Sequence, residues 1–376
     1  MVSAWLGKID NHFVNVTDPR TNRGHNYPFN ELLLLALCAA ICDCNHWTDV
    51  VAFGKAKLDW LRKFLPFENG IPSHDCLSDV FCRLDTVEFY AALESWTREM
   101  IQSLHDQTVA FDGKTLRGSH DAASGKSALH SISAWACGLR LCIGLKSTAE
   151  KSNEIPAVQQ LIDTLDLKGA TITADAMHCQ RETANKIIAK EADYILIAKG
   201  NQSQLQAAID QAITAALERQ DRNVREDHQS EQNRGRTEER TVIVLPVPKE
   251  KVFLRWAGIK SIGMIYRHTV NGEHESEQQE YFISSRPAKV RDLAKRIRQH
   301  WSIENSQHNI LDVTFGEDAS RIRNGNGPEI ISVFRRLALN ILQQDTSLKL
   351  SLRAKRKVCA WDESAFEKLL AAFCEV

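Results

Sequence analysis

The sequence lacks several patterns that would assign it to common functional classes. Its ten cysteines include no CxxC pair and no zinc-finger spacing, which excludes a zinc ribbon or zinc finger. Several of these cysteines lie in apolar stretches, so a reducing, cytosolic compartment is the simplest interpretation. The GKT sequence at Gly113–Thr115 resembles the end of a nucleotide-binding P-loop, but Thr108 stands where that loop requires glycine. Nucleotide binding by this motif is therefore excluded.

Long apolar runs and a charge of one sign are also missing. The longest apolar run, Leu32–Cys42, is too short to span a bilayer. The N-terminal stretch up to Asn30 contains no compact apolar segment with a cleavage site, so no secretory signal is expected. The formal net charge is −1 over 376 residues, so any nucleic-acid surface must come from local clusters of basic residues. With 43% hydrophobic residues, the chain can bury a sizeable core, and we expect at least two domains.

Residues 1–105 are predicted to form a small all-α N-terminal domain. Apolar residues recur every three or four positions in the segments 32–42, 49–61, 74–84 and 87–104, a spacing typical of amphipathic helices. Asn30, Thr48 and Ser73 are the expected N-caps of the first three helices. Four short helices of this kind can bury one another's apolar faces.

The pattern changes after His105. Short apolar or alternating runs predict strands at 107–112, 128–136, 139–147, 170–174 and 194–198, with helices at 155–165, 181–190 and 202–217. The order β-β-β-α-β-α-β-α is that of a ribonuclease-H-like domain, in which ligand sites lie near the carboxyl ends of parallel strands. We therefore predict an α/β domain over residues 106–376. A charged stretch at 218–240, read as a solvated loop or hairpin, and β-type runs at 241–246, 262–270 and 281–284 indicate a β-rich insertion at about 218–285.

Three acidic residues are notable for their positions relative to these elements. Asp112 and Asp175 each close a short apolar run, so each carboxylate is expected at a strand end, and Glu304 lies on a basic helical stretch far downstream of Asp175. Two carboxylates at neighbouring strand ends and one on a covering helix can hold a pair of hard divalent ions such as Mg²⁺. Two such ions can clamp the attacking and leaving oxygens of a phosphoryl displacement. Spacing alone is weak support, because the chain has 48 acidic residues and most acidic side chains are solvated.

The three acids lie within segments that resemble a known protein family. The segments FDGKTLRGS, ADAMHCQ, DYILIAKGNQ, RGRTEER, HWSIEN, LDVTFGED and FRRLALNIL follow one another in this order. They look like the DDE transposases of bacterial insertion sequences, and especially the H-repeat-associated, Rhs-linked transposase-like proteins. The resemblance covers roughly residues 13–370. Gln307 and Asn309 depart from it, because the subgroup usually has Leu and Trp there; neither replaces a presumed metal ligand, but both are expected to loosen the helix that carries Glu304.

The resemblance implies an enzyme, a DDE-type transposase with a ribonuclease-H-like catalytic domain. Asp112, Asp175 and Glu304 would be its catalytic residues and metal ligands, and two Mg²⁺ or Mn²⁺ ions its cofactors. Hydrolysis at an element end would free a 3′-hydroxyl group, which then attacks target DNA. The implied partners are double-stranded DNA of the element ends and the target, and further copies of the chain in a homo-oligomer on DNA. No membrane partner is expected, and the implied location is the cytoplasm, at the nucleoid when the protein is bound to DNA.

Basic and amide side chains near these segments are the expected DNA contacts. The predicted set is Lys114, Arg117, Lys199, Asn201, Arg296, Arg298, Arg321 and Arg323. Basic clusters at 286–298, 335–336 and 353–357 would extend a phosphate-contacting surface, although a charge run is usually a solvated face.

Several alternatives stay open from the sequence. Asp312, Glu317 and Asp318 are rival third carboxylates to Glu304. His300 and His308 stand four residues on either side of Glu304 and share its helix face, an arrangement that could bind a transition metal. His178 could orient water or simply lie on the surface. The functional alternatives are a DNA-binding remnant that no longer transposes and a stand-alone metal-dependent nuclease.

Overall fold

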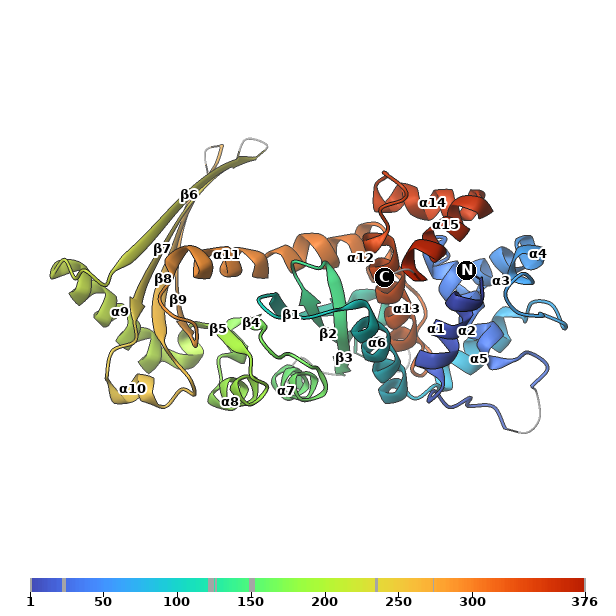
Figure 1. The fold of residues 1–376 in the computed structure, drawn as a ribbon, viewed down its shortest axis with the longest axis horizontal. Helices are drawn as coiled ribbons and strands as arrows, with labels where there is room; N and C mark the ends of the chain where they lie inside the picture. The colour runs from blue at the N-terminus through green and yellow to red at the C-terminus, as the bar shows by residue number, and fades with distance from the viewer. Residues whose placement is uncertain are drawn as a thin grey trace.

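The structure is a computed structural model that describes residues 2–21, 25–120, 125, 127–148, 153–233, 236–272 and 274–374. Its strands form one sheet in the order β3-β2-β1-β4-β5-β9-β8-β7-β6. The molecule is elongated: the sheet occupies the left and centre of Figure 1, and most helices of the two ends of the chain gather at the right.

The centre of the sheet has the predicted order of elements. Strands β1 (Thr108–Leu116), β2 (Leu129–Ala136) and β3 (Leu141–Thr148) are antiparallel neighbours, whereas β4 (Thr171–Ala174) pairs parallel to β1 and β5 (Asp193–Ala198) pairs parallel to β4. Helices α7 (Glu154–Thr164), α8 (Arg181–Ala189) and α9 (Ser203–Glu218) follow β3, β4 and β5 in turn. The expectation of a ribonuclease-H-like fold is confirmed.

The β-rich segment extends this sheet. Strands β6 (Arg225–Asn233), β7 (Arg236–Pro246), β8 (Ser261–Asn271) and β9 (His274–Ser284) are antiparallel, and α10 (Lys251–Leu254) lies between β7 and β8. Because β9 pairs with β5, the inserted strands continue the sheet of the ribonuclease-H-like core. Within the charged stretch, residues 225–233 form β6 and residues 236–240 form the first part of β7; these strands project at the upper left of Figure 1.

The N-terminal residues form helices, as predicted. These are α1 (Val2–Phe13), α2 (Phe29–Ile41), α3 (Trp47–Ala56), α4 (Leu58–Leu61), α5 (His74–Arg83) and α6 (Thr86–Met100). Ser73 caps α5, since its hydroxyl accepts a hydrogen bond from the Cys76 N–H. The other two cap predictions are wrong, because Pro28 and His46 precede α2 and α3 while Asn30 and Thr48 lie inside these helices.

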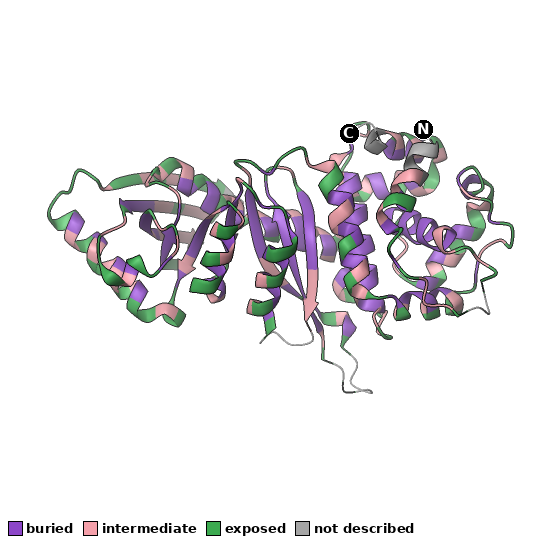
Figure 2. Cartoon of the chain, turned by 60° about the horizontal axis from the view of Figure 1, so that its bottom comes forward, coloured by how far each residue is buried: buried purple, intermediate pink, exposed green. Residues whose placement is uncertain are grey.

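Two main hydrophobic cores lie on opposite faces of the sheet. Alternate residues of β1 enter different cores, with Ala110 on the side of the N-terminal helices and Val109 and Phe111 on the side of α7, α8 and α9. The first core also contains α13 (Gly327–Gln344), α14 (Leu352–Trp361) and α15 (Glu363–Cys374), so both ends of the chain share one helical body. Figure 2 shows the resulting buried strands and the buried faces of these helices. The domain boundary at residue 105 stays a prediction.

One long helical segment connects the two halves of the molecule. It runs from α11 (Val290–His300) through a π-helix, η5 (Glu304–His308), into α12 (Asn309–Val313), and it passes over β1 and β4 (Figure 1). No helix of the described ranges is both long and apolar enough to cross a membrane.

Candidate active site

The strand register brings Asp112 and Asp175 to the same place. Parallel pairing of β1 with β4 ends at Phe111 and Ala174, so the two aspartates are the next residues on adjacent strands. Asp175 directly follows β4, as predicted. Asp112 does not lie at a strand end: β1 continues to Leu116 because it stays paired with β2 after it has parted from β4.

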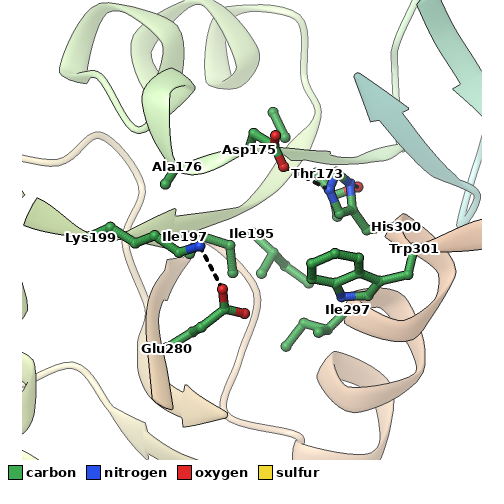
Figure 3. Close-up of a pocket in the computed structure, with 11 residues that line it drawn as sticks. Thr173, Asp175, Ala176, Ile195, Ile197, Lys199, Glu280, Ile297, His300 and Trp301 are labelled. Atoms are coloured by element: carbon green, nitrogen blue, oxygen red, sulfur yellow. Dashed lines mark hydrogen bonds and ion pairs between the residues drawn. The ribbon is translucent and has the colours of Figure 1, made fainter. Parts of the chain in front are cut away.

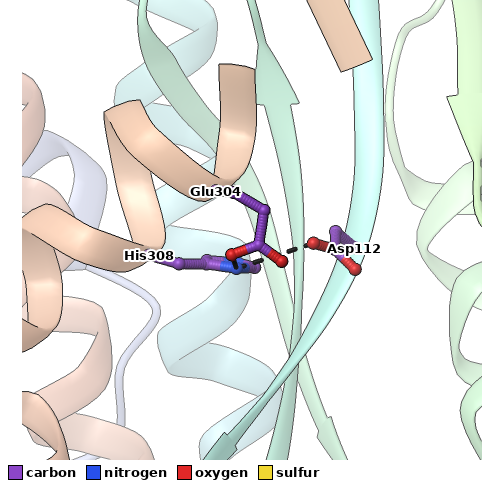
Figure 4. Close-up of side chains that lie close together, drawn as sticks. All are labelled: Asp112, Glu304 and His308. Carbon is purple, nitrogen blue, oxygen red and sulfur yellow. Dashed lines mark ion pairs between the residues drawn. The ribbon is translucent and has the colours of Figure 1, made fainter. Parts of the chain in front are cut away.

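The long helical segment brings Glu304 to Asp112. In η5 the Asn309 N–H donates to the Glu304 carbonyl five residues earlier, the pattern of a π-helix, which is frequent at functional sites. His308 Nδ1 lies 3.5 Å from Asp112 Oδ2 and 3.6 Å from Glu304 Oε2. Potential ligand atoms of the three residues all lie within 4.8 Å of one another (Figure 4). Two carboxylates from distant parts of the sequence thus meet around one imidazole.

A second histidine of the same segment faces Asp175. His300 Nε2 lies 3.4 Å from Asp175 Oδ1, and the Thr173 hydroxyl is 3.1 Å from His300 Nδ1 (Figure 3). If Thr173 donates to Nδ1, the proton of the neutral ring is on Nε2 and points at the carboxylate. Lys199 and Glu280 form an ion pair of 2.7 Å across the adjoining pocket.

The three carboxylates differ in their electrostatic environments. Burial raises the pKa of Asp112 to about 6; His308 opposes this shift and the Asp175 carboxylate adds to it. The hydrogen bond with His300 lowers the pKa of Asp175, and the hydrogen bond with His308 lowers that of Glu304. Asp112 is thus the carboxyl group of the site that holds a proton most readily.

The rival acids have another partner. Lys114, two residues after Asp112 on the same face of β1, pairs with Asp312 at 2.6 Å, Asp318 at 2.9 Å and Glu317 at 3.3 Å. Glu317 is also fully buried against Arg336. The rival acids are thus engaged with Lys114, whereas Glu304 lies beside His308 and Asp112. Gln307 is buried and Asn309 is exposed on the segment that carries Glu304.

The predicted DNA contacts fall into two groups. Lys114 and Arg296 are buried in ion pairs, Arg296 with Asp292 and Asp106, and we leave both out of the DNA surface because contact with phosphate would break these pairs. The remaining residues reach the surface at least partly: Arg117, Lys199, Asn201, Arg298, Arg321 and Arg323. Of the wider basic clusters, Arg335, Arg336, Lys355 and Arg356 are buried.

Three further polar side chains near the site form a buried cluster, and His130 and Glu154 among them were not predicted from the sequence. His178 is fully buried and bonds to Glu154, so it is not a surface histidine. Glu154 also accepts a hydrogen bond from His130. No spacing in the sequence connects these three residues, since they come from β2, α7 and the turn after β4.

The site residues fit a divalent cation. Asp112, Glu304 and His308 supply two carboxylates and one imidazole within 4.8 Å, and Asp175 adds a carboxylate on the neighbouring strand. Carboxylate oxygens suit Mg²⁺, and an imidazole nitrogen is compatible with Mn²⁺ as well.

Comparisons with known proteins agree with this geometry. The Transposase DDE domain family matches residues 103–341, and the DDE_Tnp_1-associated family matches residues 11–97. The H repeat-associated putative transposase YhhI of Escherichia coli K12 is 36% identical over 97% of this chain and 98% of its own length. The putative transposase YncI of Escherichia coli O157:H7 is 36% identical over 96% and 94%. A cryo-EM structure of the piggyBac transposase synaptic complex with hairpin DNA covers 100% of this chain and 78% of its own, with 9% identity and a TM-score of 0.42, a similarity too low to support an inference. On its sequence matches, the chain belongs to the DDE transposase family.

Proposed function

We propose that the protein cleaves DNA at the ends of its own insertion element and joins the freed ends to target DNA, with Asp112, Asp175 and Glu304 as its catalytic carboxylates. The observation that carries this proposal is the convergence of Asp112 and Glu304 around His308, with Asp175 next in register on the adjacent strand. Membership of a DDE family implies a divalent metal cofactor, and we propose two ions, Mg²⁺ or Mn²⁺.

The side chains have distinct tasks in this proposal. Asp112 and Glu304 hold one edge of the metal site and Asp175 the other, while His308 and His300 fix the orientations of these carboxylates through the contacts given above. When bound, the ions supply Lewis-acid activation of the attacking hydroxyl and neutralise charge on the phosphate. Hydrolysis of one phosphodiester leaves a 3′-hydroxyl group, and its attack on a target phosphodiester forms a new bond and releases a new 3′-hydroxyl group.

The DNA surface includes a groove between the two ends of the chain. Arg321 and Arg323 line one wall, and His46 and His74 of the N-terminal helices line the other, around a volume of about 320 Å³. Arg321 is exposed, and Arg323 donates to the Gly118 carbonyl beyond β1. We infer that duplex DNA contacts this groove through its phosphates, with Arg117, Lys199, Asn201 and Arg298 as further contacts outside the groove.

Joining two element ends in one event requires that both be held together. We therefore propose that the protein acts as a homo-oligomer on DNA, and that it is found at the nucleoid when bound. A remnant that only binds DNA is not favoured, because the chain matches transposases over nearly its whole length and the three acids are intact.

The test is a cleavage and strand-transfer assay on DNA that carries the flanks of the gene, with Mg²⁺ or Mn²⁺. We expect Asp112→Asn to abolish metal-dependent cleavage and to leave folding and DNA affinity largely unchanged, because the amide keeps the size of the side chain and removes the charge that holds the cation. Asp59→Asn, at a fully exposed position of the N-terminal helices, is the matched control and should cleave like the parent.

Two other outcomes would change the proposal. Cleavage at the parental rate by the Asp112→Asn variant would reject the site. Cleavage by the parent protein without any strand transfer to a target plasmid would indicate a stand-alone nuclease that uses the same carboxylates.

A further inference from the structure

A buried cluster of two histidines and one glutamate lies on the face of the sheet opposite the long helical segment. Glu154, the first residue of α7, accepts hydrogen bonds from His130 Nε2 of β2 at 2.7 Å and from His178 Nε2 at 2.9 Å. All three side chains are buried. The cluster lies on one face of the strands that carry the catalytic aspartates, whereas His300 and His308 lie on the other face.

The cluster contacts the chain next to both aspartates. His178 ends the short 3₁₀ turn that begins directly after Asp175. On the other strand, Gly113 directly follows Asp112, and a Cβ atom at Gly113 would lie 2.4 Å from His130 Nε2 and 3.0 Å from Glu154 Cδ. The His130 ring is also within 3.2 Å of the Thr115 hydroxyl of β1. One carboxylate therefore connects the two backbone segments from which Asp112 and Asp175 project.

The hydrogen-bond pattern requires a carboxylate at this position. Burial opposes ionisation of Glu154, but the hydrogen bonds from His130 and His178 lower its pKa to about 2. Both imidazoles donate through Nε2, and His130 Nδ1 is then free to accept from Thr115. A carboxylate accepts on both of its oxygens, whereas an amide offers one oxygen and one N–H₂ group. In a Glu154→Gln variant, the amide N–H₂ group would therefore lie against the Nε2–H group of one of the two histidines, with two donors facing each other.

We propose that Glu154 is a positioning residue, which acts through His130 and His178 to hold Asp112 and Asp175 at the separation that cation binding requires. The inference rests on the proposed metal site. Glu154 is buried on the far side of the sheet, so it contacts neither DNA nor cation. Removal of a group bonded directly to a metal ligand typically lowers metal affinity by about 10–100-fold. Glu154 acts one residue further out, through His130 and His178, so the lower end of that range applies.

The experiment measures Mn²⁺ binding to the full-length protein without DNA, by calorimetry and by the electron paramagnetic resonance signal of free Mn²⁺. For Glu154→Gln we expect Kd for Mn²⁺ to rise by about tenfold, with cleavage recovered at high Mn²⁺. His178→Gln keeps an N–H donor near the position of His178 Nε2, which bonds to Glu154, and should retain most of the affinity, whereas His178→Leu should lose it. Glu31→Gln is the matched control: Glu31 is equally buried, accepts from the Phe67 N–H, and lies in the N-terminal helices.

The possible results separate a positioning role from a structural one. If Glu154→Gln lowers the melting temperature but binds Mn²⁺ like the parent, the cluster only stabilises the fold and the proposal is wrong. If Glu154→Gln does not fold, the two His178 variants decide, since equal Mn²⁺ affinity for the Gln and Leu variants would overturn the proposal. If the parent binds Mn²⁺ no better than Asp112→Asn, the metal site itself is wrong, and the positioning role fails with it.

Discussion

Single side chains give the three carboxylates of the site different chemical characters. The Asp112 side chain is 12% exposed, whereas those of Asp175 and Glu304 are 58% and 61% exposed. Burial disfavours the charged form of Asp112, while the imidazoles favour the charged forms of the other two. When no cation is bound, Asp112, in the middle of β1, is therefore the carboxylate of the site that most readily takes up a proton.

This difference predicts how metal binding depends on pH. The pKa of Asp112 in the folded protein, about 6, lies above the ordinary value of 3.8, so protonation stabilises the metal-free fold and a cation must displace that proton. We expect the affinity for Mn²⁺ to be constant above about pH 7 and to fall by about tenfold per pH unit below 6. Titrations between pH 5 and 8, with circular dichroism as the control for folding, measure this.

The size of the pH effect is a further check. The pKa values of Asp175 and Glu304 are lowered, so both stay ionised in this range and neither should release a proton when the cation binds. An affinity that is the same at pH 7.5 and pH 5.5 would contradict the assignment of Asp112 as the titrating ligand.

At the scale of elements, ion pairs between side chains join β1 to the segment that follows η5. Thr108, Ala110, Asp112 and Lys114 alternate onto one face of β1. On that face Asp112 meets His308, and Lys114 meets the acids of α12 and of the following 3₁₀ turn, η6 (Glu317–Ala319). Although burial opposes it, Glu317 and its neighbours raise the pKa of Lys114. The ion pairs of Lys114 thus hold the long helical segment against β1 at a point that follows Glu304 in the chain.

Lys114→Met should destabilise the protein strongly. The substitution keeps the volume of the side chain but leaves Asp312 and Asp318 close together without a cation, and removal of one partner from a buried charge cluster costs about 3–5 kcal/mol. Denaturant unfolding measures the change. Lys63→Met is the control, because Lys63 is half-exposed and pairs with Glu367 at the surface, where a pair contributes only about 0–1 kcal/mol. Equal losses for both variants would contradict a structural role for Lys114.

At the scale of the whole molecule, the two ends of the chain form a single helical body beside the sheet. The groove with Arg321, Arg323, His46 and His74 lies within this body, so DNA held there would contact the first and last parts of the chain at once. With a net charge of −1, the protein has no overall attraction for DNA, and affinity must come from such local contacts.

The salt dependence of DNA binding tests the groove. Replacement of both Arg321 and Arg323 by Ala should lower the slope of log K against log salt concentration by about one unit for each phosphate that the protein no longer binds. Arg62→Ala, outside the groove and beside Asp59, should leave the slope unchanged. A labelled duplex titrated across salt concentrations measures all three proteins. An unchanged slope for the double variant would show that these arginines belong to a solvated face.

The sequence by itself determined the order of strands and helices and identified the three candidate carboxylates. Apolar periodicity is a local property, so it placed the strands and helices of the ribonuclease-H-like order, and the motifs singled out Asp112, Asp175 and Glu304. The four-residue spacing also predicted that His300 and His308 share a face with Glu304, because α-helix geometry places residues four apart on one side.

The tertiary structure alone decided which charges are paired. Lys114, Arg296 and Arg336 look like exposed basic residues in the sequence, but each is buried against acids from other segments of the chain, and no local pattern records a partner so far away in the sequence. For the same reason Glu154 could not be connected with His130 and His178. Strand register and helix packing bring such groups within hydrogen-bond distance, and register depends on the whole sheet rather than on any one strand.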